Sequence, residues 1–131
     1  GPTGTDDRSA YMLGYDNGKT ALLSSAVRLS VPVEAEIIGT KGYIKIHQPW
    51  INPRVVTLAQ AASDVGGNVF NTQTVHMPTV GNGYNYEAVE VGKCLRAGKL
   101  ESAVMPLDES LDIMITLDTI REQWGLTYPM E

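Results

Sequence analysis

The side chains that could perform chemistry are few in this chain, and they are widely spaced. Its histidines are His47 and His76, its single cysteine is Cys94, and no acidic pair has the pattern of a general acid and base. Two histidines are too few for a metal set, even if carboxylates elsewhere in the fold added oxygen ligands. We therefore expect no catalytic residue and no metal site in this chain.

A short glycine motif, Gly81-Asn82-Gly83, opens a stretch of helical periodicity. A dinucleotide-binding loop needs a third glycine and a preceding strand, and Tyr86 stands where that glycine belongs. We expect these glycines to shape the turn into the helix, and we expect no cofactor-binding residue here.

Aromatic and amide side chains gather in two loops. Residues 47–52 form a proline-bounded loop that contains Trp50, and residues 82–86 add two tyrosines and two amides. Because loops of this kind often line pockets, Trp50, Asn82 and Tyr84 are our candidates for a substrate pocket. The aromatic rings could equally pack between helices and a sheet, and the pattern alone leaves both interpretations open.

The first part of the chain is predicted to form about six strands. Asn17-Gly18 joins the first two and indicates a type I′ hairpin turn, and Thr40-Lys41-Gly42 joins the next two. Ile44 and Ile46 should share one face of the sheet, opposite Lys45. A loop is predicted at residues 63–68. The six strand ranges are 9–15, 19–28, 34–39, 43–47, 54–59 and 72–77.

After Pro78 the pattern becomes helical. One helix is predicted from Tyr84 to the glycine at position 98, with Asn82 or Asn85 as its cap, and a second from Leu107 to Gly125. Each should bury an apolar stripe. The first stripe is Tyr84, Ala88, Val91 and Leu95, and the second is Leu111, Met114, Leu117, Ile120 and Trp124.

Strands first and helices last predict an α+β domain spanning residues 1–131. We expect an open mixed, largely antiparallel sheet of about six strands with helices packed on one face. Helices are available for one face only, so the other face should be buried in a homo-oligomer.

Composition narrows the class of partner. The chain has 10 basic and 15 acidic residues, a net charge of -5, and no cluster of Lys and Arg, which argues against nucleic acid. No apolar run approaches the roughly 20 residues that would span a membrane. A single cysteine, within a predicted helix, indicates a reducing cytoplasm and an ordinary, partly buried thiol.

The C-terminal third carries a family resemblance. The residues that carry it are Tyr86-Glu87-Ala88, Val91, Cys94 to Lys99, Glu101-Ser102, Met105 to Ser110, Ile120-Arg121, Gly125-Leu126 and Tyr128-Pro129. Together they resemble the C-terminal domain of the glucose-fructose oxidoreductase, inositol dehydrogenase and rhizopine-catabolism family (Gfo/Idh/MocA), above all its dimeric dihydrodiol dehydrogenase branch. The upstream hairpins and the Trp50 loop look similar too.

The resemblance implies a function that this chain would share with a missing half. Family members bind NAD or NADP in an N-terminal Rossmann domain, which also holds a Glu-Lys-Pro motif, and their C-terminal domain closes the substrate site and builds the oligomer. The implied role is the substrate-side and oligomerisation domain of an oxidoreductase that acts on a sugar, cyclitol or diol. By the same resemblance Trp50 and the turn at residues 82–84 face the substrate. This chain alone would be inactive.

Two functions from other classes remain open at this point. The chain could be a non-catalytic dimerisation or scaffold domain, or a small-molecule binding module that acts alone. An upstream dinucleotide-binding motif in the gene would favour the oxidoreductase.

Overall fold

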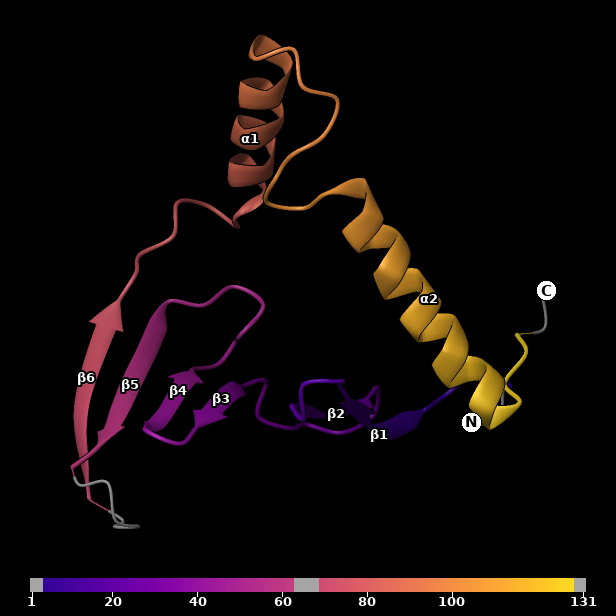
Figure 1. Ribbon diagram of the computed structural model, residues 1–131, viewed down its shortest axis with the longest axis horizontal. Coiled ribbons are helices and arrows are strands. Elements are labelled where there is room, and N and C mark those ends of the chain that lie inside the picture. The colour runs from indigo at the N-terminus through magenta and orange to yellow at the C-terminus, as the bar shows by residue number, and fades with distance from the viewer. Residues whose placement is uncertain (1–3, 63–68, 129–131) are drawn as a thin grey trace. The chain divides into compact units, whose positions relative to one another are not determined.

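The computed structural model describes residues 4–62 and 69–128 (Figure 1). Six strands are followed by two helices, which confirms an α+β fold with both helices at the C-terminal end. The strands are β1 (Arg8–Gly14), β2 (Thr20–Ala26), β3 (Ala35–Gly39), β4 (Gly42–Ile46), β5 (Val55–Ala61) and β6 (Phe70–His76); the helices are α1 (Tyr84–Arg96) and α2 (Leu107–Trp124).

The strands form two sheets, and the prediction of one sheet was wrong. The hairpin β1–β2 stands by itself, and β3–β4–β5–β6 make a four-stranded antiparallel sheet in sequence order. Between Ala26 and Ala35 the chain is irregular and includes Pro32, which has no N–H for a ladder. The Val33 carbonyl in the same stretch accepts a hydrogen bond from the Trp50 N–H at 2.9 Å. This segment therefore anchors the loop that contains Trp50 and does not pair with a strand.

The chain divides into two compact units. Unit 1 joins residues 1–31 to residues 103–131 and contains β1, β2 and α2, whereas unit 2 spans residues 32–102 and contains the four-stranded sheet and α1. The single C-terminal domain over residues 1–131 stays a prediction.

The first hairpin turn differs from the prediction. Gly18 has a φ of 78°, but no residue other than glycine has a positive φ among the described residues, so Asn17 does not adopt the type I′ conformation. Tyr15 pairs with Lys19, and the Gly18 N–H donates to the Tyr15 carbonyl at 2.9 Å. Asp16 lengthens the loop to three residues, a loop class that places only its last residue in the left-handed region.

Gly42 begins β4 at a point where no other residue fits. Its φ is 135°, and a side chain there would collide with the backbone carbonyl of Ala59 on the neighbouring strand. Ala59 is itself the one buried residue among those described. The absence of a side chain at Gly42 therefore brings β4 and β5 together over this small core.

The helix stripes are present in the sequence but are not buried. No residue of α1 or α2 is buried, and Tyr84, Leu95 and Met114 are 69%, 72% and 52% exposed. A helix buries its apolar stripe only against another layer, and the described residues supply too little of one. The predicted buried stripes were therefore wrong for this chain taken by itself.

Two further predictions concern helix starts and the loop at 63–68. Gly83, not Asn82 or Asn85, is the N-cap of α1, with no side-chain cap bond. The predicted loop at residues 63–68 lies outside the described residues.

Candidate functional site

One face of the four-stranded sheet in unit 2 carries a row of polar side chains beside Tyr43, Ala59 and Phe70, and the other face is mainly apolar. The register places Glu36, Lys45, Thr57 and Thr74 opposite one another across all four strands. Because side chains alternate along a strand, the neighbouring positions point to the other face. That face carries Ile37, Ile44, Ile46, Val56, Leu58 and Val75. The predicted separation of Ile44 and Ile46 from Lys45 is thereby confirmed.

Hydrogen bonds link the polar face. His47 Nε2 lies 2.8 Å from Thr57 Oγ1, which lies 2.9 Å from Thr74 Oγ1. Lys45 Nζ is 2.7 Å from Glu34 and 3.6 Å from Glu36. The hydrogen bond that Lys45 donates to Glu34 raises the pKa of Lys45 and so favours its charged form. We call His47, Thr57 and Thr74, together with Lys45, the polar row. These side chains can offer imidazole, hydroxyl and ammonium groups to a polar ligand.

Trp50 follows this face in the chain, just after the cis peptide bond Gln48–Pro49. Its backbone N–H is held by the Val33 carbonyl, while its side chain is 48% exposed. An anchored backbone with an exposed ring is a suitable contact for a substrate. The structure places Trp50 in unit 2, and its role in a pocket stays a prediction.

Asn82 and Tyr84 lie together in the turn that starts α1. Asn82 Oδ1 accepts a hydrogen bond from the Tyr84 N–H at 3.3 Å, and the Tyr86 hydroxyl accepts one from the Val80 N–H at 3.1 Å. Tyr84 is 69% exposed. The turn brings these two candidates into contact with each other, and their role in a pocket also stays a prediction.

Two N–H groups of the same turn already have acceptors within it. A dinucleotide phosphate site needs free N–H groups at the helix start, but here Asn82 takes the Tyr84 N–H, and the Tyr86 N–H donates to the Gly83 carbonyl at 3.0 Å. Within the part of the chain that the structure describes, no three His, Cys, Asp or Glu side chains are grouped so that they could hold a metal ion.

Glu90 organises the end of α1. Its carboxylate accepts hydrogen bonds from the Ser102 hydroxyl at 2.8 Å and from Cys94 Sγ at 3.7 Å, and Lys93 Nζ lies 3.7 Å away. The Ser102 hydrogen bond, followed by the charge of Lys93, lowers the pKa of Glu90. The hydrogen bond from Ser102 to Glu90 holds the segment after α1 against that helix, and Cys94 is part of the same cluster.

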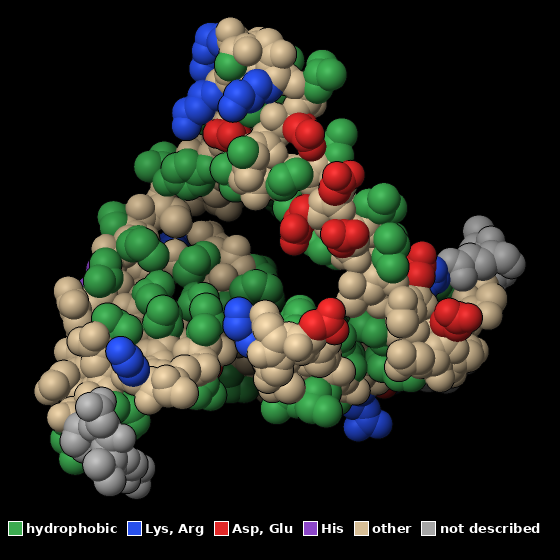
Figure 2. Space-filling model, viewed as in Figure 1, with side chains coloured by type: hydrophobic (Ala, Val, Ile, Leu, Met, Phe, Trp, Pro, Cys, Tyr) green, Lys and Arg blue, Asp and Glu red, His purple; other side chains and the backbone are tan. Residues whose placement is uncertain are grey.

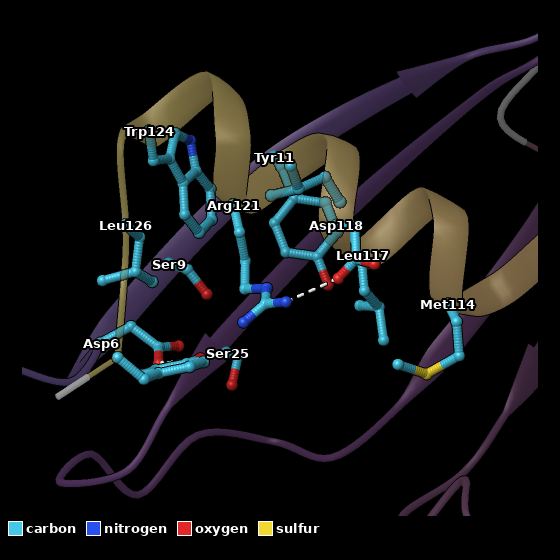
Figure 3. Close-up of a pocket in the computed structure, with 12 residues that line it drawn as sticks. Asp6, Ser9, Tyr11, Ser25, Met114, Leu117, Asp118, Arg121, Trp124 and Leu126 are labelled. Carbon is cyan, nitrogen blue, oxygen red and sulfur yellow. Dashed lines mark hydrogen bonds and ion pairs between the residues drawn. The ribbon is translucent and has the colours of Figure 1, made fainter. Parts of the chain in front are cut away.

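A hollow in unit 1 was not predicted from the sequence. It is about 440 Å³ in volume, within the usual range of ligand pockets, and lies between the β1–β2 hairpin, α2 and the tail after α2 (Figure 3). Its lining residues are Asp6, Ser9, Tyr11, Ser25, Met114, Leu117, Asp118, Ile120, Arg121, Trp124, Leu126 and Tyr128. We call it the α2 hollow.

Ring contacts and paired charges shape the α2 hollow. Trp124 meets Tyr11 edge-on with ring centroids 6.1 Å apart, and Arg121 lies 5.3 Å above the Tyr128 ring. Arg121 also pairs with Asp118 at 2.6 Å, as Figure 3 shows, and the Tyr128 hydroxyl donates to Asp6 at 3.2 Å. Tyr11 and Trp124 lie on separate elements far apart in the sequence, so no sequence pattern predicted the contact between their rings.

Comparison with known proteins gives the chain its relatives. No family model matches it. It is 33% identical over 129 residues to a trans-1,2-dihydrobenzene-1,2-diol dehydrogenase of Xenopus tropicalis and 28% identical over 138 residues to that of Homo sapiens. A D-xylose 1-dehydrogenase (NADP(+)) of Hypocrea jecorina is 30% identical over 142 residues.

These matches cover nearly all of this chain but a minor part of each relative. They span 97%, 98% and 97% of the chain, whereas the chain spans 38%, 38% and 34% of those relatives. They confirm the resemblance to dihydrodiol dehydrogenases that the sequence indicated. No helix in the described ranges is long and apolar enough to cross a membrane.

Proposed function

We propose that this chain, a homologue of dihydrodiol dehydrogenases over 97% of its length, is the substrate-side and oligomerisation domain of an NAD(P)-dependent oxidoreductase. The observation that carries the proposal is homology to dehydrogenases of a cyclic diol and of a sugar. We call the whole enzyme, with its N-terminal Rossmann domain, the parent protein. The substrate of the parent protein would be a sugar, cyclitol or diol. The single cysteine of this chain agrees with a cytoplasmic location.

In this proposal the cofactor binds outside this chain. NAD or NADP supplies the hydride acceptor when bound to the Rossmann domain. The turn at residues 81–86 supports that division, because the N–H groups of Tyr84 and Tyr86 already bond within the turn. This chain would contribute shape and exclusion of water around the substrate, and would be inactive alone.

Trp50, Asn82 and Tyr84 would be the substrate contacts supplied by unit 2. Trp50 and Tyr84 expose about half or more of their rings, at 48% and 69%, which leaves their faces available to a ring-shaped substrate. The polar row with His47 and Thr57 belongs to the same unit and could bond substrate hydroxyls. These contacts bind and orient; no proton transfer is assigned to them.

Oligomerisation would use the apolar face of the four-stranded sheet. Ile37, Ile44, Leu58 and Val75 on that face are 61%, 36%, 37% and 46% exposed. Figure 2 shows hydrophobic side chains gathered over the region of β3–β6. Exposed apolar patches of this kind usually mark an interface. The partner would be a second copy of the parent protein.

The testing experiment compares the parent protein with this chain. The parent protein should reduce NADP or NAD in the presence of trans-1,2-dihydrobenzene-1,2-diol or D-xylose, and should bind the nucleotide in calorimetric titration. The 131-residue chain should do neither, and should sediment as an oligomer. Nucleotide binding by this chain alone would overturn the assignment of the cofactor to the other domain.

A second arm tests Trp50 in the parent protein. Trp50→Ala should raise KM for the substrate about tenfold or more while KM for the nucleotide stays unchanged. Tyr15→Ala, which removes an aromatic ring that is 53% exposed in unit 1 and lies outside the α2 hollow, is the control and should leave both values unchanged. Equal changes for both variants would remove Trp50 from the substrate pocket.

A further inference from the structure

We infer that Asn82-Gly83 is a site of spontaneous covalent modification. At this site the Asn82 side chain closes onto the Gly83 backbone nitrogen and is then hydrolysed to aspartate or isoaspartate. The modification goes beyond the proposed function and does not depend on it. It falls on a residue that the proposal places at the substrate, so it would change the turn before α1 as the protein ages.

The chemistry needs only these two neighbouring residues and water. The Gly83 nitrogen attacks the amide carbon Cγ of Asn82, so a bond forms between them and the bond from Cγ to Nδ2 breaks. The Nδ2 group takes up the proton of the Gly83 N–H and leaves as ammonia, which closes a succinimide ring. Water then opens the ring at either of its carbonyl carbons and gives aspartate or isoaspartate. No atom is oxidised or reduced.

Glycine is the residue that hinders this attack least. It has no Cβ to obstruct the approach of its nitrogen, and it tolerates the left-handed φ of 99° at Gly83. A side-chain carbon added at Gly83 would meet nothing within 4 Å, so the turn is not crowded. Asn82 is exposed, and water can therefore reach the ring.

The side-chain carbonyl of Asn82 is already polarised for the attack. Its Oδ1 accepts a hydrogen bond from the Tyr84 N–H at 3.3 Å. Negative charge develops on this oxygen as the Gly83 nitrogen adds to Cγ, and an N–H directed at the oxygen stabilises that charge. The turn that starts α1 therefore assists ring closure.

A second Asn-Gly pair, Asn17-Gly18, provides a comparison within the same chain. Asn17 is also exposed, and its Oδ1 also accepts a hydrogen bond from the N–H two residues on, here that of Lys19 at 3.2 Å. Gly18 has a positive φ of 78°, and a carbon added to it would likewise meet nothing within 4 Å. The two pairs share residue types, side-chain hydrogen bond and open surroundings.

The pairs differ at the attacking nitrogen. The Gly18 N–H donates to the Tyr15 carbonyl at 2.9 Å, so this bond must break before the nitrogen can attack. Within the described residues, the Gly83 N–H has no hydrogen-bond acceptor. Breaking one such bond slows a step roughly fivefold. Asn82 should therefore convert faster than Asn17 in the folded protein.

Conversion would alter the turn in two ways. Aspartate adds a negative charge at position 82, and isoaspartate in addition lengthens the backbone by a carbon atom. The Asn82 side chain holds the Tyr84 N–H, so a longer backbone at this point would displace both candidate substrate contacts of the turn.

The experiment incubates the folded parent protein in water labelled with heavy oxygen and maps its peptides by mass spectrometry over time. Asn82 should take up the label at least about fivefold faster than Asn17. In urea, where neither turn persists, the two should convert at similar rates. Equal rates in the folded protein would overturn the inference, and so would faster conversion of Asn17 or no conversion at Asn82.

Two further readouts test the route through the ring. Isoaspartate should appear at position 82 together with aspartate, because direct hydrolysis of the amide gives aspartate alone. Asn82→Gln keeps an exposed amide but forms the larger ring much more slowly, so labelling at position 82 should be lost while labelling at Asn17 is unchanged. Aspartate without isoaspartate, or undiminished labelling in Asn82→Gln, would overturn the inference.

Labelling is read without any measurement of activity, which separates this site from the proposed function. A parent protein that converts Asn82 but reduces no nucleotide would sink the proposed function and leave the modification site standing. An active dehydrogenase in which Asn82 takes up no label faster than Asn17 would do the reverse.

Discussion

The two units differ in how many of their strands are paired and in whether they bury any residue. Unit 2 holds four strands in consecutive antiparallel pairing, a hydrogen-bonded polar row through Thr57, and the one buried residue described, Ala59. Unit 1 holds one hairpin, one helix and a hollow between them. A sheet with several paired strands can be specified by local residues, whereas a hairpin and a helix need a further layer.

The difference bears on function as well. The candidate substrate residues Trp50, Asn82 and Tyr84 all belong to unit 2, while the hollow belongs to unit 1. A hollow with an apolar lining is often taken as a binding site. In this hollow the charged side chains bond within the lining, since Asp118 pairs with Arg121 and Asp6 accepts from Tyr128.

The largest expected effect lies in unit 2, at Gly42. Gly42→Val should reduce the free energy of unfolding by about 3 kcal/mol or more, because the backbone is at a φ of 135° and the side chain would meet Ala59. Urea unfolding measures the change. The control is Gly39→Ala on the paired position of β3, where an added carbon makes an ordinary contact of 3.8 Å. A mild effect at Gly42 would mean that β4 and β5 are not held closely.

The polar row should come next. Thr57→Val removes the hydroxyl between His47 and Thr74 and should reduce the free energy of unfolding by about 1–2 kcal/mol. Thr72→Val, on the same face of β6, is the matched control and should be neutral or slightly stabilising. Similar values for both variants would show that the row contributes nothing to the stability of unit 2.

A smaller effect is expected in unit 1 from its ring contact. Trp124→Leu should cost about 1 kcal/mol more than Trp50→Leu, because Trp124 meets Tyr11 edge-on. The two tryptophans are 45% and 48% exposed, so their loss of buried area is similar. Denaturant midpoints in the 131-residue chain provide the comparison. If Trp50→Leu costs as much, the hairpin and α2 do not stabilise each other through these rings.

The smallest effect concerns the pH dependence of unit 2. The pKa of Glu90 is lowered in the folded chain, mainly by Ser102, so its stabilisation is full above the unfolded pKa and is lost as pH falls through the folded one. Ser102→Ala should raise the pKa of Glu90 toward its ordinary value and weaken that acid dependence. A carboxyl NMR titration reports it. Ser102→Thr keeps the hydroxyl and should restore the low pKa.

Much of the secondary structure could be predicted from local pattern. Six alternating or β-rich runs became six strands, and the change of period after Pro78 marked both helices. The hairpin at Asn17 was found, but its turn type was wrong, because Asn-Gly indicates a two-residue loop and Asp16 adds a third. Turn type depends on which residues close the ladder, and sequence shows that only approximately.

The candidate site was predicted less completely. Loop position and ring chemistry were enough to nominate Trp50 and Tyr84, but no pattern in the chain indicated that His47, Thr57 and Thr74 form one row. Their alignment depends on the register of three strands. The Glu90–Ser102 bond was also missed, since it joins residues 12 positions apart across a helix end.

The sequence by itself determined the class of fold, the order of its elements and the family resemblance, because periodicity, turn residues and motif spacing are local properties. Only the tertiary structure decided that the strands split into two sheets, that the helix stripes stay exposed, and that a hollow lies beside α2. Pairing and burial depend on which layers meet in space. The apolar stripes of α1 and α2 are present in the sequence, and no residue of either helix is buried.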